Sequence, residues 1–190
     1  MDSINRPLKI LSTLDQLLSK PLELIIIGRS ALALGYKKPQ AQFFSTMDVD
    51  AIISDSYVSE IESNFDFWEA SEKLNIALEN EGLYFTHIFE EKQIIIRPNW
   101  YNQKQRLLIE HFEKIQLYRP HTIDLILSKM MRNDPEDFDD IRFLLDQLEG
   151  NDLKELPNQI QSARLPDLEE IQELFNLSKD RLLKLLKSRN

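Results

Sequence analysis

The sequence predicts an α+β fold, in which a small mixed sheet is flanked by helices and followed by a helical C-terminal part. Two short apolar runs, at residues 24–27 and 51–53, are bounded by turn-forming and acidic residues, as buried strands commonly are. Most of the chain beyond residue 120 instead carries apolar side chains at the spacing of amphipathic helices. We therefore expect an α/β core in residues 1–120 and a helical part packed on it in residues 121–190.

Hydrophobic spacing and turn residues give the individual elements. Helical spacing predicts helices at residues 4–18, 57–81 (interrupted near 63–66), 122–131, 135–149 and 166–187. Runs of apolar or β-branched residues predict strands at residues 24–27, 48–53, 83–90, 93–97, 106–109 and 114–118. Residues 41–45 are expected to form a loop, and residues 151–164 a weakly helical connector.

Single residues mark where several of these elements begin or end. Gly82 is a natural helix terminator, and Gly150 is expected to stop a second helix in the same way. Asp134 followed by Pro135 is typical of a helix start, because the aspartate caps free N–H groups and proline fits the first helical position. The three isoleucines at residues 94–96 are expected to be buried on both faces of a strand.

The composition limits the classes of protein to which the chain can belong. Its 190 residues are 42% hydrophobic and 29% charged, which allows a sizeable core and does not indicate disorder. A net charge of −9 argues against non-specific coating of nucleic acid, although a local basic patch could still bind RNA. The chain has no cysteine, and it has no apolar run of the roughly 20 residues that a membrane helix needs. We therefore expect a cytoplasmic protein without membrane association.

Two aspartates at the start of the second apolar run are the best candidates for a metal site. Asp48 and Asp50 alternate with Val49, so on a strand both carboxylates project from one face, with Cβ atoms about 6.5–7 Å apart. Converging carboxylates repel each other unless a cation lies between them. Mg²⁺ held by one or two carboxylates together with substrate phosphates is a common solution. The alternative is that the pair forms a polar strand end exposed to solvent.

The turn after the first apolar run offers a complementary site for an anion. Gly28 lets the backbone approach a phosphate closely, and the residues from Ser30 onward are typical of the first turns of a helix, where N–H groups are free. The Ser30 hydroxyl could contact a phosphate or serve only as a helix cap. Arg29 could point outward, add a phosphate contact or crowd the pocket. This segment therefore combines a phosphate cradle with an acidic pair 20 residues later.

The order of these motifs resembles that of the nucleotidyltransferase superfamily. Within it, the chain looks most like small bacterial proteins related to AbiEii/MenA-type toxins. The matching segments are GRS at 28–30, ALAL at 31–34, TMDVD at 46–50 and LSK at 127–129, followed by Arg132, Asp134, Asp137 and Asp140. The resemblance covers about residues 8–148, and relatives usually carry a small residue where this chain has Arg29.

The resemblance implies an Mg²⁺-dependent transfer of a nucleoside monophosphate from a nucleoside triphosphate to a hydroxyl group. Asp48 and Asp50 would be the catalytic and metal-binding residues. Gly28, Arg29 and Ser30 would bind the nucleotide. The acceptor would be RNA, in particular tRNA, or a protein. The chain would then be the toxin of a toxin–antitoxin pair, with an antitoxin as its partner.

The same resemblance gives two later basic residues a role at the nucleotide. Lys129 and Arg132 lie three residues apart, on one helix face. Lys129 would be catalytic, because it would neutralise the charge of the leaving pyrophosphate. Arg132 would add a nucleotide contact, and Asp137 or Asp140 could pair with these cations and orient them. The alternative is a solvated basic edge.

Two other functions remain open at this stage. The chain could be a catalytically silent nucleotidyltransferase-fold protein that binds a partner. The absence of a third carboxylate on the expected strand at residues 93–97, which Glu90 and Glu91 only flank, favours that function. The chain could also be a small-molecule, antibiotic-type adenylyltransferase, which an acidic pocket for a cationic substrate would favour. The three scattered histidines lack the spacing of zinc ligands.

Overall fold

We describe a computed structural model of the chain, which covers residues 5–189. The fold is α+β, as the sequence predicts, and the chain divides into two compact units. One unit comprises Met1–Glu90 and Lys104–Arg119, and the other comprises Glu91–Gln103 and Pro120–Asn190. The domain ranges expected from the sequence, with a boundary at residue 120, stay a prediction.

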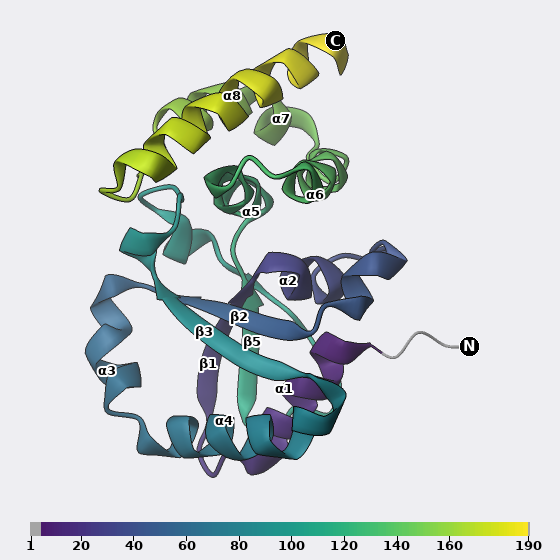
Figure 1. Cartoon of the computed structure of the whole chain (residues 1–190), viewed down its shortest axis with the longest axis vertical. Helices are drawn as coiled ribbons and strands as arrows, with labels where there is room; N and C mark the ends of the chain where they lie inside the picture. Colours follow the sequence, from purple (N-terminus) through teal and green to yellow (C-terminus); the bar gives the residue numbers. More distant parts are fainter. Residues whose placement is uncertain (1–4, 190) are drawn as a thin grey trace. The chain divides into compact units, whose positions relative to one another are not determined.

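A five-stranded mixed sheet forms the centre of the first unit (Figure 1). Its strands are β1 (Leu22–Ile27), β2 (Asp48–Ile53), β3 (Tyr84–Glu90), β4 (Gln105–Arg106) and β5 (Ile115–Arg119), in the order β3-β2-β1-β5-β4. β1 runs antiparallel to β2 and parallel to β5, while β2 and β3 run parallel. This order makes β2 the neighbour of both β1 and β3, so residues from three strands can meet around its aspartates.

The helices of the first unit support this sheet. They are α1 (Arg6–Leu17), α2 (Gly28–Leu34), α3 (Val58–Glu62) and α4 (Phe65–Leu78). α1 and α4 lie side by side, and α4 also packs against β3 (Figure 1). The predicted helix at 57–81, its interruption and its end at Gly82, where φ is +65°, are confirmed. The expected loop at 41–45 is instead a short 3₁₀ helix, and the first residue of the helix predicted at 4–18 lies outside the described residues.

Four α-helices make up most of the second unit. They are α5 (Thr122–Ser128), α6 (Pro135–Leu145), α7 (Gly150–Gln161) and α8 (Glu169–Arg189). Asp134 caps α6 as predicted, since its Oδ1 accepts a hydrogen bond of 2.8 Å from the Glu136 N–H. The prediction for Gly150 is wrong, because α6 ends four residues earlier than expected and Gly150, with φ +55°, begins α7. The expected weak connector at 151–164 is therefore largely a helix, with Pro157 inside it.

The strand predicted at residues 93–97 is wrong. This segment follows the 3₁₀ turn Glu91–Gln93. Instead of pairing as a strand, it forms an isolated β-bridge between Ile96 and Arg164. The three isoleucines are buried, as expected, but within the second unit. A side chain takes the place of a neighbouring strand here, because the Asp124 carboxylate accepts bonds from the Arg97 N–H and from its guanidinium, the shortest at 2.6 Å.

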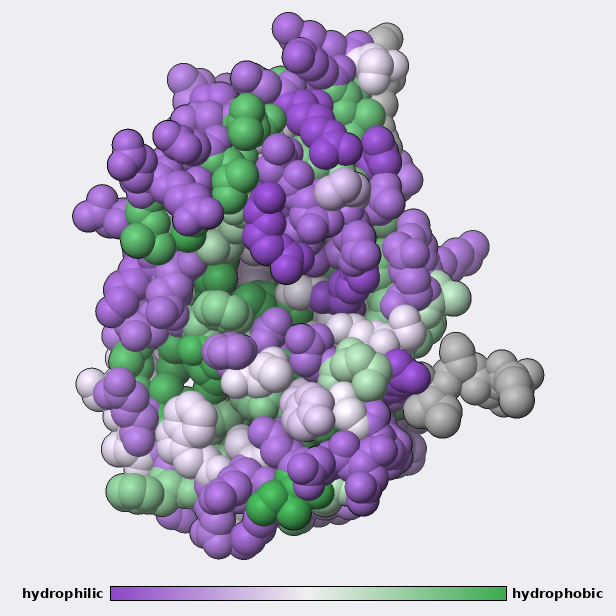
Figure 2. Space-filling model, in the orientation of Figure 1, coloured by the Kyte–Doolittle hydropathy of each residue, from purple (hydrophilic) through white to green (hydrophobic). Residues whose placement is uncertain are grey.

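On the face drawn in Figure 2, hydrophilic residues predominate and hydrophobic residues stand between them. In the part of the chain that the structure describes, every helix is too short or too polar to cross a bilayer.

Candidate functional site

The turn after β1 lies next to the aspartates of β2. Gly28 begins α2 with φ +65°, a left-handed conformation that glycine adopts without strain. Ile27, the residue before it, pairs with Asp50 across the two strands. A Cβ atom placed on Gly28 would lie 3.9 Å from the Asp50 Oδ2. The structure therefore brings together the glycine turn and one acid of the pair that the sequence singled out.

Threonine hydroxyls hold both aspartates. The Thr46 Oγ1 donates a hydrogen bond of 2.8 Å to the Asp48 Oδ1, and the Thr86 Oγ1 donates one of 2.7 Å to the Asp50 Oδ1. Val49 is fully buried between the two acids, which are partly exposed, as the alternation of a strand predicts. The Asp50 side chain keeps 29% of its surface exposed. The two carboxylates are thus oriented by hydroxyl donors and remain accessible.

The position beside Asp50 on β3 does not supply a third acid. A register shift between β2 and β3 places Thr86 and His87 next to Asp50, with the His87 Nδ1 3.9 Å from its Oδ1. Glu90 pairs with Ile53, three residues further along β2. Within residues 5–189, there is no group of three or more acidic, histidine or cysteine side chains placed to hold a metal ion.

Ser30 and Arg29 follow Gly28 in α2. Ser30 is buried, and its hydroxyl donates a hydrogen bond of 2.9 Å to the Ile27 carbonyl. This bond closes the turn, but Ser30 is not the helix cap, because Ile27 holds the capping position of α2 and no side chain caps it. Arg29 is half-buried. The turn itself is therefore fixed by its own residues.

Lys129 and Arg132 belong to the second unit and contact acids of α6 there. The Lys129 Nζ lies 2.7 Å from the Asp140 Oδ2 and 3.2 Å from the Asp137 Oδ1. The Arg132 guanidinium donates two bonds of 2.9 Å to the same Asp137 carboxylate. The pairing of these cations with Asp137 and Asp140, expected from the sequence, is confirmed.

Burial and charge together set the pKa values in this cluster. Burial raises the pKa of the Asp137 carboxyl, but hydrogen bonds from Arg132 and the charge of Lys129 outweigh it, so that the pKa lies below its ordinary value. The hydrogen bond to Asp137 raises the pKa of Arg132. Arg132 and Asp137 therefore each favour the charged form of the other.

Two residues beside the aspartates were missed by sequence reasoning. Thr86 and His87 carry no motif, and they reach Asp50 through the pairing of β2 with β3. The alternation of the strand at 83–90 shows that one of its faces carries polar residues, but it does not give the register. The signal that could have found them is the pairing of two strands more than 30 residues apart.

A protein family described as "Nucleotidyltransferase of unknown function (DUF6036)" matches residues 6–175. The chain belongs to this family. The match of a nucleotidyltransferase family to most of the chain confirms the superfamily that the motifs predicted, and its span includes Gly28, Asp48, Asp50, Lys129 and Arg132. Searches of the curated proteins and of the solved structures found no match to this chain.

Proposed function

We propose that the chain transfers a nucleoside monophosphate from a nucleoside triphosphate to a hydroxyl group, with the help of Mg²⁺. The observation that best supports this function is the closeness of Gly28 to Asp50. A Cβ atom built on Gly28 would lie 3.9 Å from the Asp50 Oδ2. A glycine turn that a phosphate can approach, next to a carboxylate that can hold a cation, suits a ligand that is a metal-bound phosphate.

The donor set of β2 fits Mg²⁺. Asp48 and Asp50 offer carboxylate oxygens, which are the hard ligands that Mg²⁺ prefers, and both are partly exposed. Two carboxylates leave several coordination positions to substrate phosphates and water. When bound there, Mg²⁺ would supply charge neutralisation at the attacking and leaving oxygens.

The residues around the carboxylates would bind and orient the substrate. The backbone at Gly28 would approach the triphosphate, while Thr46 and Thr86 would keep the two carboxylates in position through their hydrogen bonds of 2.8 and 2.7 Å. The role of Lys129 and Arg132 at the phosphates stays a prediction. Because Lys129 already contacts two carboxylates, its first role is to stabilise the second unit.

The identity of the acceptor follows from the resemblance to AbiEii/MenA-type toxins. On that basis the acceptor hydroxyl belongs to RNA, in particular tRNA, or to a protein. The chain would then act in the cytoplasm as a toxin whose partner is an antitoxin.

One observation favours a second candidate function, that of a catalytically silent nucleotidyltransferase that binds a partner. Thr86 and His87 occupy the place beside Asp50 where a third acid would strengthen metal binding. Within residues 5–189, no set of three metal-binding side chains replaces it.

Label transfer separates the two functions. The full chain is incubated with Mg²⁺, α-labelled nucleoside triphosphates and either total RNA or cell protein. We expect labelled acceptor with the unchanged chain. The amount of label transferred should fall by roughly 100-fold or more in Asp48→Asn or Asp50→Asn. Asp167→Asn, which removes an equal charge at an exposed position, is the matched control. Equal transfer by Asp50→Asn would overturn the proposed site, while no transfer and no triphosphate binding by any variant would support the silent protein.

A further inference from the structure

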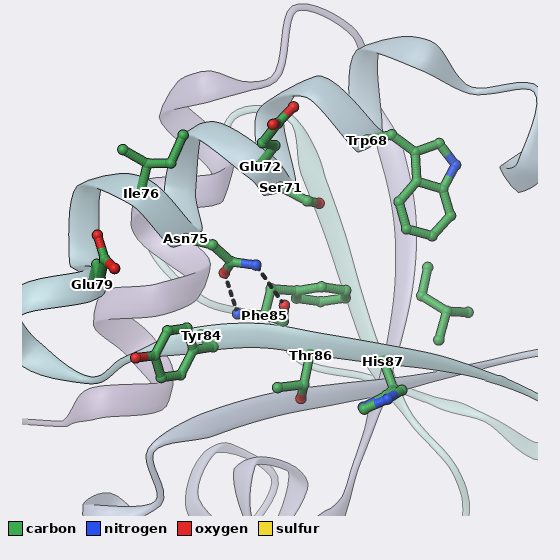
Figure 3. A pocket seen from close by; sticks show the side chains of 11 residues that line it. Trp68, Ser71, Glu72, Asn75, Ile76, Glu79, Tyr84, Phe85, Thr86 and His87 are labelled. Carbon is green, nitrogen blue, oxygen red and sulfur yellow. Dashed lines mark hydrogen bonds between the residues drawn. The ribbon is translucent and has the colours of Figure 1, made fainter.

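A groove runs between α4 and the edge strand β3 of the first unit (Figure 3). Its volume is about 680 Å³. One face of α4, continued by Glu79 of the following 3₁₀ turn, lines the groove along its length with residues at helical spacing: Trp68, Ser71, Glu72, Asn75, Ile76 and Glu79. Trp68 and Ile76 are 44% and 67% exposed, although both are large and apolar in most of their surface. Apolar side chains exposed along a groove are typical of a binding surface.

The groove contains a polar atom that needs a partner. Ser71 is 6% exposed, and its buried hydroxyl has no hydrogen-bond partner among the described residues. Figure 3 shows this hydroxyl pointing away from α4, toward the space between Trp68 and Phe85. Buried polar groups are nearly always hydrogen-bonded, so this hydroxyl indicates a ligand that donates or accepts a bond there.

Recognition in the groove depends on side chains more than on the edge of the sheet. The Asn75 amide accepts a bond of 2.8 Å from the Phe85 N–H and donates one of 3.0 Å to its carbonyl (Figure 3). This amide takes the place of a neighbouring strand at Phe85. A partner segment therefore cannot extend the sheet through that residue without displacing Asn75.

The charges that line the groove favour a cation. Glu72 and Glu79 are exposed acids on its helix side. The described residues that line the groove include no lysine or arginine, and His87 is the one basic residue among them. Lys73, on the same helix, lies 2.6 Å from Glu69 and does not line the groove. A phosphate backbone would be repelled here, whereas a guanidinium could stack on Trp68 and donate bonds to carboxylates and to the Ser71 oxygen.

We propose that this groove binds an arginine-bearing, extended segment of a partner polypeptide. The guanidinium group has five N–H donors and no acceptor, which matches a groove of carboxylates and an unpaired hydroxyl. The binding does not require nucleotidyl transfer, so it can be tested separately from the function proposed above.

The test uses the full chain and a fluorescein-labelled nonapeptide that alternates Arg with Ala. Its control is the same peptide with citrulline, which keeps the shape of arginine without the charge. By fluorescence anisotropy up to about 1 mM peptide, we expect the arginine peptide to bind at least about tenfold more tightly than the citrulline peptide. Binding should also protect Trp68 from acrylamide quenching, since Trp100 is fully buried.

Variants of the groove locate the binding. Ser71→Ala removes a hydroxyl that makes no bond within the described chain, so the fold should persist while the affinity falls about fivefold. Glu72→Gln with Glu79→Gln should weaken binding about tenfold at low salt, because two attractive charges are lost. Glu60→Gln with Glu62→Gln, two exposed acids of α3, makes the same change of charge outside the groove and should leave binding unchanged.

Several results would overturn the proposal. Equal affinity for the arginine and citrulline peptides, or no binding of either at about 1 mM, would do so. An equal effect of the α3 variant would show attraction to net charge alone. Binding of spermidine or of an RNA oligonucleotide, lost in Trp68→Ala, with no peptide binding, would assign the groove to another ligand.

Discussion

Two pairs of aspartates in this protein have the same chemistry and opposite surroundings. Asp48 and Asp50 on β2 are partly exposed and accept hydrogen bonds from threonine hydroxyls. Asp137 and Asp140 on α6 have side chains that are 3% and 0% exposed and that contact Lys129. A buried carboxylate must be neutralised within the fold, while a partly exposed one can take its cation from a ligand. The difference separates acids that hold the structure from acids that can serve a site.

The largest expected effect is the loss of stability when the buried pair is broken. Asp140→Asn would leave the Lys129 ammonium, 11% exposed, without the carboxylate 2.7 Å away. We expect a loss of about 3–5 kcal/mol in the free energy of unfolding, measured in urea, because the buried ammonium then keeps the Asp137 carboxylate, 3.2 Å away and shared with Arg132, and its charge is incompletely compensated. Asp50→Asn should cost less than about 1 kcal/mol. Equal losses for both variants would contradict the division between the two pairs.

The second prediction concerns the pH dependence of the same cluster. The pKa of Asp137 is lowered in the folded protein, so the carboxylate stabilises the fold above its unfolded pKa, and this contribution is lost as the pH falls through the folded pKa. Asp137→Asn should therefore cost about 2 kcal/mol at pH 7, and the gap to the unchanged protein should close below about pH 4. Urea unfolding at a series of pH values measures the gap. A gap that stays constant down to pH 3 would show that the charge of Asp137 is not what stabilises the fold.

Local signals in the sequence were enough to predict both pairs of acids, but not their surroundings. The alternation at residues 48–50 predicted the shared face of Asp48 and Asp50, and the motif order with its helical spacing predicted that Asp137 or Asp140 pairs with Lys129 or Arg132. In both cases the residues involved are at most 11 positions apart in the sequence, so a local pattern can relate them. Thr86 was missed because its bond to Asp50 depends on a register between β2 and β3, including a shift at Val49, that no local pattern encodes.

The errors in the fold have a similar cause. Three β-branched isoleucines at 94–96 predict a buried strand, yet a buried segment needs only partners for its backbone, and the Asp124 carboxylate supplies one. Gly150 has the left-handed φ of a helix end, but the same conformation also suits a residue that starts a new helix. The burial of the isoleucines and the backbone conformation of Gly150 were therefore predictable from the sequence. The segments and side chains that each of them contacts were not.

Two glycines with the same left-handed backbone conformation, one in each unit, sharpen the comparison. Gly28 and Gly150 have φ values of +65° and +55°, so an alanine at either should cost about 1–2 kcal/mol of stability. A Cβ at Gly150 meets no atom within 4 Å in the described structure, whereas one at Gly28 faces the Asp50 carboxylate. We expect Gly28→Ala alone to reduce Mg²⁺-dependent triphosphate binding, measured by titration calorimetry. Equal binding by the two variants would remove the glycine turn from the proposed site.

The smallest expected effect comes from the hydroxyl that holds Asp50. Thr86→Val removes the donor 2.7 Å from the Asp50 Oδ1, and because the site is partly exposed, water can replace it at a cost below about 1 kcal/mol in stability. The carboxylate would lose its orientation, so the Mg²⁺ concentration for half-maximal triphosphate binding should rise about threefold to tenfold. Thr13→Val, which deletes a hydroxyl bonded to the Lys9 carbonyl on α1, is the control for lost hydroxyls in the same unit. If Thr86→Val destabilised the protein strongly and left the Mg²⁺ dependence unchanged, Thr86 would be part of the structural framework, and the exposed acids of β2 would resemble the buried acids of α6 after all.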